Sequence, residues 1–159
     1  MIIYIDADAL PTIAKDLIVK TAGRTQVEAV FVANKPIKLP PSPYLRMMVV
    51  AQGFDVADNF IATQVRMGDL VITSDIPLAD EVLTKGAKVL TPRGEEFTAS
   101  NIKAKLNARD FMESLRGTGV LDPNQMGGQK PYGDKDKQAF ANGLNRLVRP
   151  NLSPKNNPS

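Results

Sequence analysis

Cysteine and histidine are both absent from this chain of 159 residues. Without cysteine the protein has no disulfide bond, no thiolate metal site and no cysteine nucleophile. Without histidine it lacks the commonest general base and the commonest ligand of transition metals. Any chemistry must therefore depend on carboxylates, lysines, hydroxyl groups or a bound ion.

Long apolar runs are missing as well. The apolar run at residues 1–5 is cut off by Asp6 and follows no basic leader. We therefore expect neither a signal peptide nor a membrane span, and a location in a cytosol of the bacterial type.

Length and composition favour one globular unit. With 43% hydrophobic residues and mixed charges, the chain can bury a normal core, so we expect one domain over residues 1–149 and a flexible tail over residues 150–159. The net charge of +3 is compatible with a polyanionic partner such as nucleic acid. Scattered lysines and arginines are, however, more often solvated surface.

The order of apolar patterns predicts the fold. Short, continuously apolar runs that predict strands cover residues 1–5, 27–32, 47–50, 70–73 and 88–90. Helical spacing of apolar residues is present at residues 11–22, 58–67, 75–85, 98–116 and 134–147. In the longest of these helices the residues expected to face inward are Ile102, Leu106, Met112 and Leu115. Continuously apolar strands that alternate with helices indicate a parallel sheet covered on both faces, which is a three-layer α/β sandwich.

One connection departs from this alternation. Between the second and third apolar runs the chain contains Pro36, Pro40, Pro41 and Pro43. A helix does not persist through such a stretch, so we expect a loop there.

Acidic residues follow several of the predicted strands. Asp6 and Asp8 follow the first strand, Asn34 follows the second, Asp75 follows the fourth, and Asp58 opens the helix before it. Ligands of an open parallel sheet bind outside the carboxyl ends of its strands. Carboxylates held close together repel one another, so a cluster that stays ionised at neutral pH usually holds a cation. Oxygen ligands suit Mg²⁺ or Mn²⁺, and we expect the metal ligands to be Asp6, Asp8, Asp58 and Asp75.

Helix capping is the competing interpretation of most of these residues. Asp8, Asp58 and Asp75 each lie near a predicted helix start, where an aspartate cap contributes about 1 kcal/mol. Both interpretations stand for these three residues. Asp6 directly follows Ile5 in a buried strand and is the strongest candidate for a functional carboxylate.

Several segments carry a family resemblance. They are YIDADA at residues 4–9, PSP at 41–43, GFDVADN at 53–59, GDLVITSDIPLA at 68–79 and PRG at 92–94. Together they resemble the bacterial YaiI/YqxD family over residues 1 to about 148, with Leu10 standing where that family commonly has cysteine. The family is grouped with PIN-like domains, many of which are metal-dependent nucleases. The resemblance therefore implies a PIN-like three-layer sandwich.

The same resemblance implies an activity. PIN-like nucleases place an aspartate at the end of the first strand, an acidic residue on a central helix, and an aspartate after a Thr-x pair that ends a later strand. Asp6, Asp58 and Asp75 match these positions and would be the catalytic residues of an Mg²⁺- or Mn²⁺-dependent phosphodiesterase, acting on RNA rather than DNA. Residues implied to contact the substrate are Asn34, Lys38, Arg46 and Arg93.

Two other functions fit parts of the sequence. A non-catalytic module that binds RNA or protein would keep the acidic cluster only to stabilise its fold. A haloacid-dehalogenase-like phosphatase also begins with an apolar strand and an Asp-x-Asp pair, and Thr73 suits its second motif. The phosphatase is less favoured, because no paired acidic motif follows Lys85 and Lys88.

Overall fold

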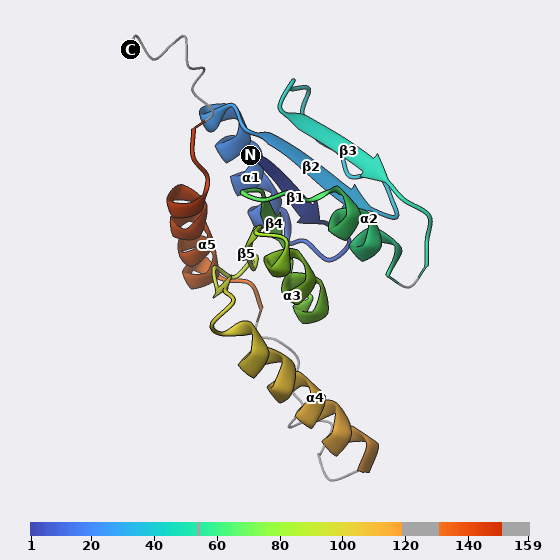
Figure 1. Ribbon diagram of the computed structural model, residues 1–159. Helices are drawn as coiled ribbons and strands as arrows, with labels where there is room; N and C mark the ends of the chain where they lie inside the picture. Colours follow the sequence, from blue (N-terminus) through green and yellow to red (C-terminus); the bar gives the residue numbers. More distant parts are fainter. Residues whose placement is uncertain (54, 119–130, 151–159) are drawn as a thin grey trace.

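A doubly wound sheet forms the centre of the protein (Figure 1). The computed structural model describes residues 1–53, 55–118 and 131–150. Within these ranges the strands are β1 (Ile2–Asp6), β2 (Glu28–Ala33), β3 (Leu45–Val49), β4 (Leu70–Ile72), β5 (Lys88–Leu90) and β6 (Glu96–Phe97). Their order is β3-β2-β1-β4-β5-β6, and only β6 is antiparallel to its neighbour.

Helices cover both faces of this sheet (Figure 1). In the described part of the chain they are α1 (Thr12–Thr25), α2 (Val56–Gln64), α3 (Ile76–Thr84), α4 (Ile102–Thr118) and α5 (Asp134–Leu147). Because side chains alternate along a strand, Ile3 and Ile5 of β1 pack toward α1 and α5, whereas Tyr4 packs toward α2 and α3. The predicted three-layer α/β sandwich is confirmed.

A loop replaces a helix in the crossover from β2 to β3. The proline-rich segment predicted as a loop connects these two parallel strands. Ile37 and Leu39 from this segment pack against the same core as α1. Two apolar side chains of an extended segment thus cover the part of the sheet that a crossover helix would otherwise cover.

The strand order reverses beside β1. Strand β2 lies on one side of β1 and is reached through α1, which covers one face of the sheet. Strand β4 lies on the other side of β1 and is reached through α2, which covers the opposite face. The loops that follow β1 and β4 therefore diverge and leave a crevice at the carboxyl ends of these strands. This crevice lies where Asp6 ends β1.

Two features differ from the sequence-based expectation. The two-residue strand β6 was not predicted, because such a short segment carries no periodic pattern. The helix predicted from residue 98 begins at Ile102. Before it lies a turn in which the Thr98 backbone N–H donates to the Asn101 side chain and the Asn101 backbone N–H donates to the Thr98 hydroxyl. Of its predicted inward residues only Ile102 is fully buried, because α4 extends away from the sheet (Figure 1).

No helix within the described ranges is both long and apolar enough to cross a membrane. The tail predicted from residue 150 lies, beyond Pro150 itself, outside the described residues.

The turn between β5 and β6 provides a test of how α5 docks. Gly94 has φ +91°, and a Cβ atom added there would lie 2.5 Å from the Ala139 backbone of α5. We expect Gly94→Ala to lower the free energy of unfolding by about 2 to 3 kcal/mol, measured by chemical denaturation.

The matched control is Gly23→Ala in α1, where no atom beyond the neighbouring residues and the local helix backbone lies within 4 Å of the added carbon. Alanine is a better helix former than glycine, so this change should raise stability by up to about 1 kcal/mol. Equal stability of the two variants would contradict the close packing of α5 on the turn.

Candidate active site

A buried hydroxyl joins the ends of β1 and β4. The Thr73 hydroxyl donates a hydrogen bond to Asp6 Oδ2 at 3.0 Å and accepts one from the Asp75 backbone N–H at 3.0 Å. Thr73 is only 1% exposed, so this geometry is held inside the protein. Strands β1 and β4 are hydrogen-bonded neighbours, which places the three residues at one point of the sheet edge.

Asp75 caps helix α3. Its Oδ1 accepts a hydrogen bond from the Leu78 N–H at 2.9 Å, and Pro77 lies in the first turn, as favoured at helix starts. The capping interpretation is therefore confirmed for Asp75. The cap bond orients the Asp75 carboxyl group, and the same group lies close enough to Asp58 to raise the pKa of that residue.

Asp58 lies in the first turn of α2 but does not cap this helix. The cap position is held by Asp55, whose side chain makes no capping bond. The capping interpretation of Asp58 is therefore wrong. Asp55 adopts φ 63°, a left-handed conformation that non-glycine residues adopt at a cost and that often occurs at functional sites.

Burial and neighbouring carboxylates perturb the titration of this cluster. Burial raises the pKa of Asp58 to about 7, with further upward contributions from the hydrogen bond and charge of Asp75 and from the charges of Asp6 and Asp55. Burial also raises the pKa of Asp6, although the Thr73 hydrogen bond opposes it, and the charges of Asp75 and Asp8 add to the rise. These carboxyl groups thus lie close enough to disfavour one another's ionisation.

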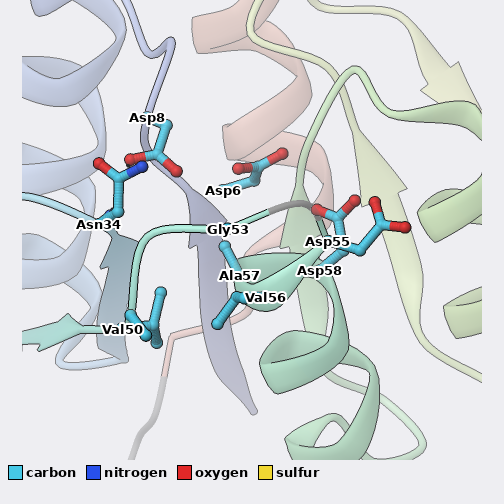
Figure 2. Close-up of a pocket in the computed structure, with 10 residues that line it drawn as sticks. Asp6, Asp8, Asn34, Val50, Gly53, Asp55, Val56, Ala57 and Asp58 are labelled. Atoms are coloured by element: carbon cyan, nitrogen blue, oxygen red, sulfur yellow. Dashed lines mark hydrogen bonds between the residues drawn. The ribbon is translucent and has the colours of Figure 1, made fainter.

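Asp8 and Asn34 form the other side of the site. The Asn34 backbone N–H donates to Asp8 Oδ1 at 2.8 Å, which links the ends of β1 and β2. Asp8 does not cap α1, since the cap position is Pro11 and no side chain bonds there. Figure 2 shows Asp8 and Asn34 on one side of a cavity, Asp55 and Asp58 on the other, and Asp6 between them.

The predicted metal ligands supply oxygen donors, and the metal site itself stays a prediction. Within residues 1–53, 55–118 and 131–150, no three acidic side chains gather in the spacing of a metal-binding group. Asp58 instead lies against Asp75, and the Asp6 carboxylate accepts a hydrogen bond from the Thr73 hydroxyl. The donors are oxygen atoms only, and such a set suits Mg²⁺ or Mn²⁺.

The predicted basic contacts do not line the cavities beside these aspartates. Arg46 pairs with Glu28 at 2.9 Å, and Arg93 pairs with Asp136 at 2.9 Å. Lys38 is exposed in the proline-rich loop.

Two other cations lie in this region. Lys35 lines a cavity beside Asp8, and Arg109 of α4 lines one beside Asp58. Lys35 directly follows Asn34 in the sequence, so its position near the end of β2 could have been predicted from the sequence. Arg109 offered no such signal, because its approach depends on how α4 leaves the sheet.

The fold and the site define a doubly wound α/β domain with an acidic centre at its switch point. Residues 4–150 match the family described as "Uncharacterized BCR, YaiI/YqxD family". The chain therefore belongs to the YaiI/YqxD family, as its sequence motifs indicated.

Similar proteins agree with this assignment. The proteins named "UPF0178 protein" of Psychrobacter cryohalolentis and Psychrobacter arcticus are each 63% identical over 149 residues, covering 94% of this chain and 100% of theirs. The Shewanella amazonensis protein of the same name is 52% identical over 148 residues, covering 93% of this chain and 97% of its own. No solved structure matches the protein significantly.

The raised pKa of Asp58 makes stability depend on pH. In the folded state the Asp58 carboxyl group stays protonated up to about pH 7. An aspartate in the unfolded chain loses its proton at a pKa of about 3.9. Between these values the folded state binds more protons, so the free energy of unfolding falls as pH rises. Asp58→Asn removes this loss, and we expect the variant to be more stable than the parent at pH 8, by about 1 kcal/mol after allowance for solvent screening.

Urea denaturation at pH 4 and pH 8, with a chelator present, measures the effect. Asp16→Asn on the exposed side of α1 controls for the loss of one negative charge. A stability gain for Asp58→Asn that is as large at pH 4 as at pH 8 would contradict the raised pKa.

Proposed function

We propose that this protein is a divalent-metal-dependent nuclease that hydrolyses phosphodiester bonds, in RNA rather than DNA. The observation that carries the proposal is the gathering of Asp6, Asp58 and Asp75 at the switch point of the sheet, with the pKa of Asp58 raised to about 7. The preference for RNA rests on the resemblance to PIN-like domains.

The energetics of the cluster support a functional role. Carboxyl groups that are partly buried beside one another destabilise a fold, and perturbed acids of this kind occur mainly at functional sites. The cluster forms although the chain as a whole is positive. A bound divalent cation would offset the repulsion between Asp58 and the neighbouring carboxylates, which otherwise raises the pKa of Asp58.

Each residue has a distinct task in this proposal. An Mg²⁺ or Mn²⁺ ion bound here would supply an activated water and positive charge for the departing oxygen. Thr73 orients the Asp6 carboxylate, and the cap bond to Leu78 orients that of Asp75. Asp58 faces both and completes the oxygen donors, while Asp8, oriented by the Asn34 N–H, extends them toward β2.

One observation favours a non-catalytic module that binds RNA or protein. No three acidic side chains in the described part of the chain have the spacing that holds a metal ion, and a cluster that serves only the fold needs no such spacing. The phosphatase alternative receives less support, because Lys85 donates to the Ala62 carbonyl oxygen and does not line the cavities around Asp6.

A paired substitution tests catalysis. We expect the purified protein to cleave single-stranded or structured RNA in the presence of Mg²⁺ or Mn²⁺, and Asp6→Asn together with Asp75→Asn to lower the rate at least about a hundredfold. Asparagine keeps an acceptor for Thr73 and remains a good helix cap, so the fold should persist.

Gel analysis of labelled RNA and DNA measures the rates, and Asp16→Asn serves as the charge control. Cleavage that survives the double substitution would rule out this mechanism. Binding of RNA without cleavage would favour the non-catalytic module.

A thermal-shift measurement tests the ion itself. If Mg²⁺ or Mn²⁺ binds the folded state at about 100 times its dissociation constant, the free energy of unfolding rises by about 2.7 kcal/mol and the melting temperature by several degrees. We expect this shift in the parent protein at pH 8 and not in the double variant. An equal shift in both proteins, or none in the parent, would place the ion elsewhere or exclude its binding.

A further inference from the structure

Three neighbouring cavities lie in a row along the carboxyl ends of the strands. The central cavity, of about 100 Å³, shares Asp8 and Asn34 with a cavity of about 350 Å³ beside β2. On its other side it shares Asp55 and Asp58 with a cavity of about 390 Å³ beside α3. We call this row of cavities, with the acidic centre in its middle, the edge groove.

The outer cavity beside β2 combines a cation with an apolar wall. Lys35 lines this cavity together with Pro36 and the half-buried Ile37. Gln52 contributes an amide from the loop that follows β3. Such a cavity can bind an anionic group at its lysine and an uncharged planar group against its apolar wall.

The outer cavity beside α3 repeats this combination on the opposite side of the acidic centre. Arg109 lines it together with Pro77 and Leu78, and Asn59 contributes an amide. Glu81 adds a carboxylate to those of the acidic centre. Arg109 forms ion pairs with Asp110 and Glu113 on its own helix, but all three side chains are more than 40% exposed. Exposed pairs contribute little, so the guanidinium group can bind a phosphate instead at small cost.

From this arrangement we infer that the edge groove binds a single-stranded polynucleotide across its acidic centre, with one base and phosphate subsite at Lys35 and another at Arg109. This inference rests on the proposed function and adds the path that the substrate strand follows across the acidic centre. Cations bind phosphates in any sequence, and apolar walls accept the flat face of any base.

The apolar walls of the outer cavities favour a single strand over a duplex, because the bases of a duplex are stacked and paired and do not offer their faces. The central cavity, of about 100 Å³, is small and lined by polar groups, which suits a phosphate group. A subsite on each side of Asp6 also places the phosphodiester at the acidic centre inside the chain and not at its end. In the hydrolysis, water adds to phosphorus, the ester bond to one sugar oxygen breaks, and that oxygen takes up a proton.

Binding by fluorescence anisotropy tests the two subsites. The probes are a labelled single-stranded RNA of about 12 nucleotides, the DNA of the same sequence, and a blunt duplex. Measurements use the full chain with Ca²⁺ at several salt concentrations, and gels verify that the probes stay intact. We expect the double variant Lys35→Ala with Arg109→Ala to weaken single-strand binding at least about tenfold and to reduce the slope of log K against log salt by about 1.4.

The matched controls are Lys20→Ala on α1 and Arg146→Ala on α5, of which Arg146 also carries one exposed ion pair, to Glu96. Both should leave affinity and slope unchanged. An unchanged slope in the Lys35 and Arg109 double variant, an equal loss in the controls, or equal affinity for the duplex would overturn the inference. Preference between the RNA and DNA probes identifies the sugar that the subsites accept.

Cleavage of a circular single-stranded RNA separates this inference from the proposed function. A groove with a subsite on each side of the centre predicts that the circle is opened, because no chain end is needed. Binding that depends on Lys35 and Arg109 without cleavage of any probe supports the groove and refutes the nuclease. Cleavage that is unaffected by the double variant, or that attacks only linear chains, supports the nuclease and refutes the groove.

Discussion

One buried hydroxyl group holds the acidic centre together. Thr73 donates to the Asp6 carboxylate and accepts from the Asp75 N–H, so the end of β1, the end of β4 and the start of α3 share a single point of attachment. Asp58 then approaches this point from α2 on its own face of the sheet. A valine has the shape of threonine without the hydroxyl, and in its place Asp6 and Asp75 would lose the bond that sets their relative orientation.

The sequence was sufficient for those parts of the molecule that follow from local pattern and general topology. Continuous apolar runs located the five parallel strands, and their order along the chain placed Asp6 and Asp75 at one edge. It was not sufficient where long-range contacts decide. Arg93 was assigned to the substrate, but it pairs with Asp136 of α5, a residue that no local pattern brings near it.

The proline-rich crossover explains why the site is open toward β2. A helix between β2 and β3 would begin with a capped turn close to Asn34 and would fill the space above it. The extended segment instead follows the face of the sheet through Ile37 and Leu39, which leaves Lys35 beside the acidic centre. The prolines thus serve both packing and access, since they exclude a helix where one would close the groove.

Helix α4 projects from the sheet and carries a cation, Arg109, to the side of the acidic centre. Ile102 anchors the helix in the core, and Arg109 lies about two turns further along, on the same side of the helix. The aspartates of the acidic centre are positioned by the sheet and by α2 and α3, whereas Arg109 is carried by a helix that leaves the sheet. The length and helical phase of α4 therefore decide where the guanidinium group of Arg109 lies, without moving the aspartates.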